Sequence, residues 1–297
     1  MNKIKHTGAG DRVFDFSVTV FMLIMILVTV YPLYYVIVAS FSDNVALMTS
    51  PGLLIWPRGF GTGAYRLAFQ HPLVISGYRN TMIILLFSIP LNLIMTWLCG
   101  YFLAAKNVMA KKPIQFVILF TMFFSGGMIP AFLNIHQLGL ANSLAALILP
   151  GALSVFNAII CRTAIESIPI SLSESAYIDG ANDFTVLFRI IIPLIMPTTA
   201  VLILYYGVGH WNSWFPASLY ITDNLKLPIQ NILRSVLIAT TAGQGQGFAL
   251  LVTDHQDNFA EAIKYSIIVI TTLPILLVYP FLQKYFVKGV MLGAVKG

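Results

Sequence analysis

The sequence predicts an all-α integral membrane protein with six spanning helices. Hydrophobic residues make up 58% of the chain and charged residues only 9%, whereas a soluble globular protein carries about 25% charged residues. The main solvent of this chain is therefore lipid. Apolar runs also recur at lengths near the roughly 20 residues that cross a bilayer. We predict a single transmembrane domain, residues 1–297, with spans at 14–39, 79–105, 113–134, 142–162, 187–209 and 263–286.

The first predicted span follows a short basic segment that contains Lys3, Lys5 and Arg12. A cleaved signal peptide has an apolar region of about 7–15 residues, and this run is much longer, so we expect a retained span. Several later spans contain proline, which is costly inside a soluble helix. In a membrane bundle, neighbouring helices re-satisfy the backbone groups that proline frees.

The distribution of basic residues predicts the orientation. Six spans place both termini on the same side of the membrane. If that side also holds 106–112 and 162–189, it carries eleven Lys and Arg, and the other side carries six. Because positively charged loops stay in the cytoplasm, we predict cytoplasmic termini. The same topology gives a cytoplasmic loop at 163–186 and long outer loops at 40–78 and 210–262.

Several function classes are disfavoured. The five histidines show no metal-ligand spacing, and the cytoplasmic loops are short for an active site, which argues against an enzyme. The basic excess is explained by orientation, so we expect no nucleic-acid partner. No ionisable residue lies in the centre of a predicted span, which argues against ion-driven transport. An ion-coupled secondary sugar transporter stays the alternative, because backbone carbonyls also bind sodium.

The stretch ESAYIDGANDF, residues 174–184, is an acidic patch between apolar runs. Pro169 marks a helix boundary, and Ser171 and Glu174 have the spacing of a capping box. We therefore predict a short helix from about 172 to 180. Gly180 is expected to end this helix in the left-handed conformation, and Asp183 to cap the next one.

Small residues on one stripe of this predicted helix, Ala176 and Gly180, would permit close approach by another surface. One interpretation is a helix that docks in a cleft of a soluble partner, whose motion would pass into the neighbouring spans. The other is an ordinary short helix in a cytoplasmic loop, with solvated acids. The next helix would carry its apolar positions at Phe184, Leu187, Phe188, Ile191 and Ile192.

The spacing Glu174-Ser-Ala-(x3)-Gly180-(x9)-Ile190-x-x-Pro193 resembles the "EAA" signature of permease subunits in bacterial ATP-binding-cassette (ABC) importers. Two positions depart from it: Ser175 stands for alanine and Ile192 for leucine. The chain as a whole is most similar to carbohydrate-importer permeases of the type found second in maltose-like systems. YPLYYVIVASFS (31–42), WPRGF (56–60), TMFFSGGMIP (121–130), NSLAALILPGALSVFN (142–157) and VGHWNSWFPA (208–217) resemble a branch for oligosaccharides and polysaccharides, alginate included.

The resemblance implies a type I ABC importer permease fold in the bacterial cytoplasmic (inner) membrane. It implies four kinds of partner: a second, different permease, two ABC ATPase subunits, an extracytoplasmic sugar-binding protein and the lipid membrane. ATP and Mg would be bound by the ATPases, so this chain would bind no cofactor and catalyse no reaction. Residues Glu174 to Ala181 would form a coupling helix, docked in a cleft of the ATPase with Glu174 paired to a basic group. The expected coupling residues are Glu174, Ser175, Ala176, Asp179, Gly180, Ala181, Ile190 and Pro193.

Three further sets of residues are weaker predictions. Aromatic and amide side chains suit sugar stacking and hydroxyl bonding. The candidates for the substrate path are Phe123, Phe124, Ser125, Asn157, Tyr206, His210, Trp211 and Asn212. A glycine-rich outer tip, without the spacing of a phosphate-binding loop, is a candidate contact for the binding protein: Gly243, Gln244, Gly245, Gln246 and Gly247. The tail 288–297 resembles family tails that reach the ATPases, and a frayed terminus is its alternative.

Overall fold

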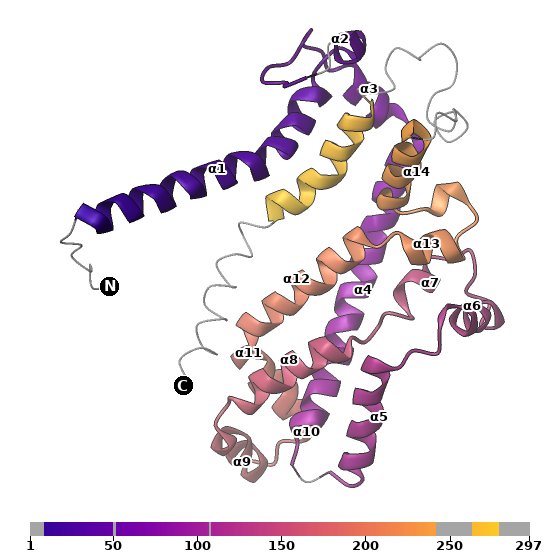
Figure 1. The fold of residues 1–297 in the computed structure, drawn as a ribbon. Helices are drawn as coiled ribbons and strands as arrows, with labels where there is room; N and C mark the ends of the chain where they lie inside the picture. The colour runs from indigo at the N-terminus through magenta and orange to yellow at the C-terminus, as the bar shows by residue number, and fades with distance from the viewer. Residues whose placement is uncertain (1–8, 50–51, 107, 242–262, 279–297) are drawn as a thin grey trace. The chain divides into compact units, whose positions relative to one another are not determined.

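The computed structural model describes residues 9–49, 52–106, 108–241 and 263–278. Within these ranges the chain forms helices and no strands, which confirms the all-α class (Figure 1). By contacts the chain divides into two compact units. One contains residues 1–70 and 236–270, and the other contains 71–235 and 271–297.

The first unit begins with one long apolar helix, α1 (Ala9–Ser40), followed by α2 (Asn44–Thr49) and α3 (Gly63–Gln70). Side chains from 10 to 30 of α1 are exposed although they are mostly apolar, as expected for a helix surrounded by lipid. The C-terminal end of α1 is packed instead. Val38 and Ala39 are buried with Leu54, and Tyr35 and Tyr265 pack against them.

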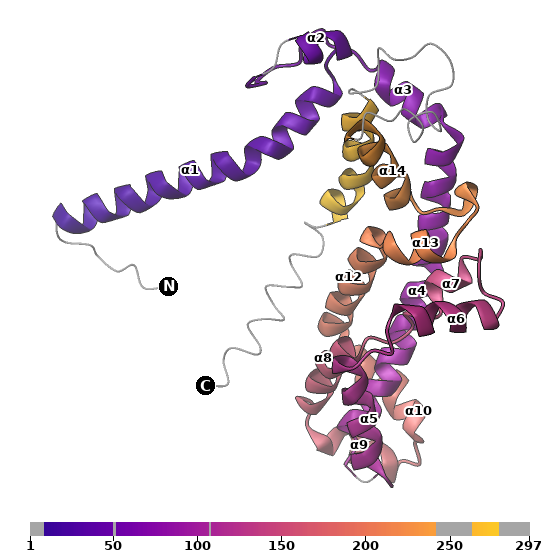
Figure 2. The same cartoon turned by 45° about the vertical axis from the view of Figure 1, so that its right-hand side comes forward.

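The second unit is built on α4 (Pro72–Ala104), a helix of 33 residues. Its start is fixed by His71, whose Nδ1 accepts a hydrogen bond of 3.2 Å from the Leu73 amide, and by Pro72 at the first helical position. α8 (Val155–Glu166) and α12 (Met196–Asn212) pack along α4, and the same arrangement is visible after a 45° rotation (Figure 2).

One face of α4 is buried although the helix reads as uniformly apolar. Residues at four-residue spacing form this face: Asn80, Ile84, Ser88, Asn92, Thr96 and Gly100. In lipid, helices associate through small residues and interhelical hydrogen bonds. Asn92 donates from Nδ2 to the Gly151 carbonyl oxygen at 2.6 Å. Asn80 donates to the Leu225 carbonyl oxygen at 2.8 Å, which ties the start of α4 to the 3-10 turn Asn224–Lys226.

Two of the predicted spans contain sharp bends. The segment 113–134 is divided between α5 (Lys111–Phe123) and α6 (Met128–Gln137), which meet at 111°. Gly127 lies at this bend with φ 91°, a conformation that favours glycine. The segment 187–209 bends by 86° between Leu194 and Met196. Its cause is local, because Pro193 and Pro197 flank the break and neither can donate a backbone hydrogen bond.

The remaining predicted segments also contain short helices that the sequence analysis did not predict. Segment 142–162 contains α7 (Ala145–Ile148) and α8, and a connection with the N-cap Ser154 separates them. The predicted outer loops include α2, α3, α13 (Phe215–Tyr220) and α14 (Ile229–Thr241). The last span is described as the helix Ile263–Val278. By length and composition α1 and α4 each suit one complete span, and the six-span topology stays a prediction.

Candidate functional site

The first part of the acidic patch, residues 174–178, lies in α9 (Ile170–Ile178), at the C-terminal end of α4 (Figure 1). The predicted capping box is wrong. Pro169 occupies the N-cap position and no side chain caps the helix, so Ser171 already lies inside the first turn. Its carbonyl oxygen accepts a 2.8 Å hydrogen bond from the Ser175 hydroxyl. Because proline fixes φ near −65°, it sets the start of the helix two residues before the position that the box would require.

The end of α9 is the predicted one. Gly180 has φ +84°, directly after the C-cap Asp179. The Ala181 amide donates to the Ala176 carbonyl oxygen at 2.9 Å, and the Gly180 amide donates to the Tyr177 carbonyl oxygen at 3.0 Å. These two bonds form a Schellman motif, in which a left-handed residue satisfies the last carbonyls of a helix.

Glycine is favoured at position 180 because of its positive φ and not because space is short. A Cβ at this position would meet no atom within 4 Å. Gly180→Ala is therefore expected to destabilise the end of α9 by about 1–2 kcal/mol, the cost of a left-handed L residue. Amide exchange in residues 177–181 should accelerate by about 5- to 30-fold. Gly139→Ala is the matched control, since Gly139 has φ +69° and an equally open site. Gly139→Ala should leave amide exchange in residues 177–181 unchanged. If exchange in these residues is equally fast in both variants, Gly180 does not hold the end of α9.

The predicted small-residue docking stripe is wrong in one position. Ala176 is only 8% exposed, and it packs in the core of its own chain with Ile165, Val186 and Leu187. Ala181 packs against the same core. Ala176 of the signature and the nearby Ala181 thus attach α9 to the spans. Glu174, Ser175 and Asp179 remain exposed.

After α9 the chain turns into an unusual segment. Asn182, and not the predicted Asp183, is the N-cap of the next helix, since its side chain accepts from the Thr185 amide at 2.8 Å. α10 (Asp183–Thr185) leads into a π-helix at Val186–Ile191 and then α11 (Ile192–Leu194). Ile190 lies in the π-helix and Pro193 in α11. π-turns are rare and frequently found at functional sites.

The π-helix explains which apolar side chains are buried. Val186 and Leu187 are buried, and so are Ile191 and Ile192 five residues later. In a π-helix each amide bonds to the carbonyl five residues earlier, and the two buried pairs have this spacing. Phe184, predicted as an apolar position of this helix, lies in α10 before the π-helix and is 66% exposed. Phe188 is 42% exposed, with its ring edge against Trp97 at 6.4 Å.

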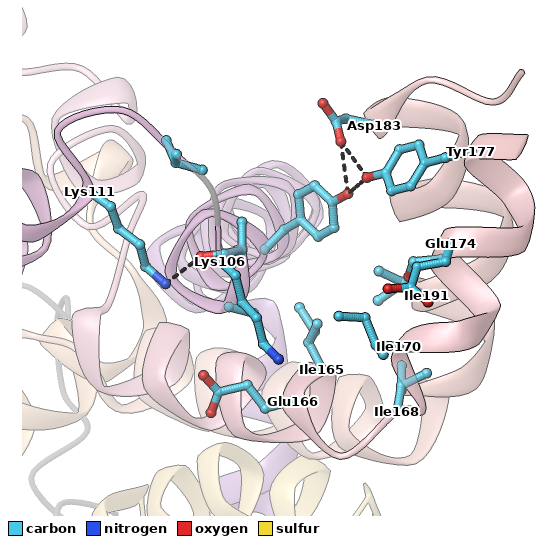
Figure 3. Close-up of a pocket in the computed structure, with 15 residues that line it drawn as sticks. Lys106, Lys111, Ile165, Glu166, Ile168, Ile170, Glu174, Tyr177, Asp183 and Ile191 are labelled. Atoms are coloured by element: carbon cyan, nitrogen blue, oxygen red, sulfur yellow. Dashed lines mark hydrogen bonds between the residues drawn. The ribbon is translucent and has the colours of Figure 1, made fainter.

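A cavity of about 660 Å³ lies beside α9, and Figure 3 shows its walls. The end of α4, the start of α5, the end of α8 and one face of α9 line it. Its charged lining residues are Lys106, Lys111, Glu166, Glu174 and Asp183. Glu166 is paired with Arg162 at 2.7 Å, whereas Glu174 makes no ion pair with any residue that the structure describes.

A hydrogen-bonded cluster forms one wall of this cavity. The Tyr101 and Tyr177 hydroxyl oxygens lie 2.8 Å apart. Asp183 Oδ1 accepts from Tyr177 at 2.6 Å and from Tyr101 at 3.1 Å (Figure 3). Partial burial, and then the bond to Asp183, raise the pKa of Tyr177, so its phenol stays protonated at neutral pH. Sequence reasoning missed Tyr101 and Tyr177, because no local pattern connects positions 76 residues apart.

The candidate substrate-path residues fall into two groups. Phe123, Phe124, Ser125 and Asn212 are exposed, the first three at the bend between α5 and α6. Asn157, Tyr206 and Trp211 are buried, and His210 is half-buried with Nε2 2.9 Å from Asn92 Oδ1. Trp211 donates from Nε1 to the Thr271 carbonyl oxygen at 3.0 Å. The tip Gly243–Gly247 and the tail 288–297 lie outside the described residues.

Tyr206 is placed to hold helices together. Its hydroxyl lies 2.7 Å from Thr96 Oγ1 and accepts from the Ser154 amide at 3.1 Å. Tyr206→Phe is expected to lower the free energy of unfolding by about 1 kcal/mol, with an unchanged KM for the transport that the sequence predicts. The thermal midpoint of the purified complex and the uptake kinetics measure the two effects. A raised KM with unchanged stability would instead show that Tyr206 contacts the cargo.

The fold and the sequence define the class of protein. Residues 80–292 match the family model described as the binding-protein-dependent transport system inner membrane component. The chain therefore belongs to this family, and it is a multi-pass inner-membrane permease. The family resemblance drawn from the acidic patch is confirmed.

Particular relatives narrow the comparison. The chain is 38% identical to the polygalacturonan/rhamnogalacturonan transport system permease protein YtcP of Bacillus subtilis, over 97% of this chain and 99% of that protein. It is also 38% identical to protein LplC of the same organism, over 98% of both chains. Its structure is similar to a chain of a bacterial ABC transporter involved in the import of the acidic polysaccharide alginate. That match has a TM-score of 0.85 and 31% identity, and it covers 95% of this chain and 99% of the other.

Proposed function

We propose that this permease imports acidic oligosaccharides, of the galacturonate or alginate type, as part of an ATP-driven system. The similarity to a polygalacturonan/rhamnogalacturonan permease along nearly the whole chain carries this proposal, and the alginate transporter supports it. The chain forms the translocation path with a second, different permease. An extracytoplasmic binding protein delivers the sugar, and two ABC ATPase subunits bind ATP and Mg. This chain contributes transport and coupling and no catalytic residue.

The coupling role is assigned to α9. Glu174 is exposed, unpaired within the described chain and placed at the rim of a cavity, where it is available to a basic group of an ATPase. Ser175 and Asp179 are exposed on the same helix. Ala176 and Ala181 pack the helix onto the core, so displacement of α9 moves the core with it. Ile190 lies in the π-helix, and Pro193 lies in α11 beside the bend. These two segments connect the core to α12.

The cargo path is assigned to the exposed candidates at the bend between α5 and α6 and at the end of α12. Phe123, Phe124 and Asn212 present ring faces and an amide, which suit sugar rings and hydroxyls. Binding-protein contact is assigned to the tip Gly243–Gly247 by its position in the predicted outer loop.

Reconstitution of the complete complex tests the function. Proteoliposomes that contain both permeases and the ATPases, with the binding protein outside, are expected to accumulate galacturonate or alginate oligosaccharides only when they enclose ATP. Maltotriose serves as the neutral control sugar. Uptake that requires an ion gradient, and proceeds without ATP, would overturn the proposal in favour of secondary transport. Accumulation of maltotriose alone would overturn the acidic cargo and leave the ABC mechanism intact.

A further inference from the structure

Coupling helix α9 is joined by the chain to α8 on one side and to α10 on the other, and its sequence gives it no link to α4. The structure supplies one. Tyr177 of α9 contacts Tyr101 in the last turn of α4 and Asp183 at the start of α10. We name these three residues the tyrosine latch.

The number of hydroxyl protons in the tyrosine latch determines which residue donates to which. Two hydroxyl protons serve three contacts, because each phenol donates one hydrogen bond and the carboxylate donates none. The two shorter contacts, at 2.8 and 2.6 Å, use both protons if Tyr101 donates to Tyr177 and Tyr177 donates to Asp183. The contact of 3.1 Å from Tyr101 to Asp183 is then the weaker alternative. Tyr177 is therefore the central member, and the chain of bonds runs from α4 through α9 to α10.

The surroundings of the latch connect it to both ends of the proposed coupling path. Tyr101, Tyr177, Asp183 and Glu174 line the same cavity, so a partner group that pairs with Glu174 arrives beside the latch. On the other side, α4 packs against α8 and α12 along its buried face. A carboxylate acceptor makes such hydrogen bonds stronger than bonds between neutral groups, and successive bonds polarise one another.

We propose that the tyrosine latch is a second mechanical connection between the ATPase-driven helix and the translocation path, through α4. Tyr101 and Tyr177 are positioning residues: they hold α9 on α4 so that displacement of α9 also moves α4. This role rests on the proposed function, since it requires that α9 receives motion from an ATPase. It adds a route that runs outside the signature residues, because Tyr101 and Tyr177 occupy none of the positions that define the signature.

The test measures sugar imported per ATP hydrolysed in proteoliposomes that contain the complete complex and a galacturonate oligosaccharide as the probe. Tyr177→Phe and Tyr101→Phe are each expected to lower this ratio by roughly threefold to tenfold, the net size of one ordinary hydrogen bond. ATPase subunits should co-purify in normal amounts. The double variant should lie close to the single variants, because both substitutions cut the same chain of bonds.

Tyr220→Phe is the matched control. The Tyr220 ring stacks on Phe132 at 6.3 Å, a contact that phenylalanine keeps, and the ratio should stay at the wild-type value. A latch variant with the ratio of Tyr220→Phe would overturn the proposal. So would uptake and hydrolysis that fall in equal proportion, since that pattern shows a structural role only. Failure of the proposed function is distinct from both, because the wild-type complex itself would then show no ATP-driven uptake.

Discussion

Replacing Gly100 with leucine is expected to prevent assembly of a stable permease. A Cβ on Gly100 would lie 2.8 Å from Cys161 Sγ and 2.9 Å from Cys161 Cβ. Cys161 is fully buried, so it has no open space into which to retreat. Overpacking a tight contact costs about 1–3 kcal/mol for small additions, and leucine adds a branched chain at the point where α4 meets α8. We expect Gly100→Ala to lower the thermal midpoint and Gly100→Leu to abolish the folded yield.

A second substitution separates the helix contact from a general intolerance of this position. Cys161→Gly removes both clashing atoms, so Gly100→Ala with Cys161→Gly exchanges the small residue between the two helices. This pair should recover part of the yield lost in Gly100→Ala. Gly209→Ala in α12 is the control, because its Cβ would meet nothing within 4 Å and alanine favours a helix. Equal loss in Gly100→Ala and Gly209→Ala would show that the α4–α8 contact is not the cause.

Sequence reasoning identified α9 and its C-terminal end, because both depend on neighbouring residues. Gly180 follows directly on the last turn, where a left-handed residue is required. The start of α9 was misplaced, since two local signals competed. The Ser171 and Glu174 spacing suggested a capping box, but Pro169 had already ended the preceding turn. The docking stripe failed for a different reason: helical periodicity groups Ala176 with Gly180, but only the fold shows that Ala176 faces its own core.

The buried face of α4 had a sequence signal that a search for apolar runs overlooks. Ser88, Asn92, Thr96 and Gly100 recur at four-residue spacing within an apolar segment, a pattern typical of a helix interface in lipid. The π-helix at Val186–Ile191 had no such signal, because its buried residues Leu187 and Ile191 are four apart and also fit an ordinary α-helix. The tyrosine latch had no local signal, because it forms only when α9 folds against the end of α4.

Reversing the charge of Glu174 is expected to have the largest effect on transport of any single exposed substitution. Glu174→Lys places a cation where we propose that an ATPase presents a basic group. Loss of the pair and the new repulsion should weaken ATPase binding by roughly 30-fold or more, the range of an interface hot spot. Folding should be unaffected, because Glu174 is exposed and makes no ion pair within the described chain. Co-purification of the ATPase and ATP-driven uptake should fall together.

Two substitutions by neutral glutamine show whether the ATPase binds through a specific ion pair with Glu174 or through the general negative charge around the cavity. Glu174→Gln keeps the shape of the side chain and should show an intermediate loss. Glu166→Gln removes an equal charge from the same cavity, but Glu166 is already paired with Arg162 at 2.7 Å within one helix, an interaction worth only about 0.3–0.5 kcal/mol. ATPase binding should therefore be nearly normal in Glu166→Gln. If both glutamine variants lose binding equally, the ATPase responds to the field of the acidic patch, and Glu174 is not its specific contact.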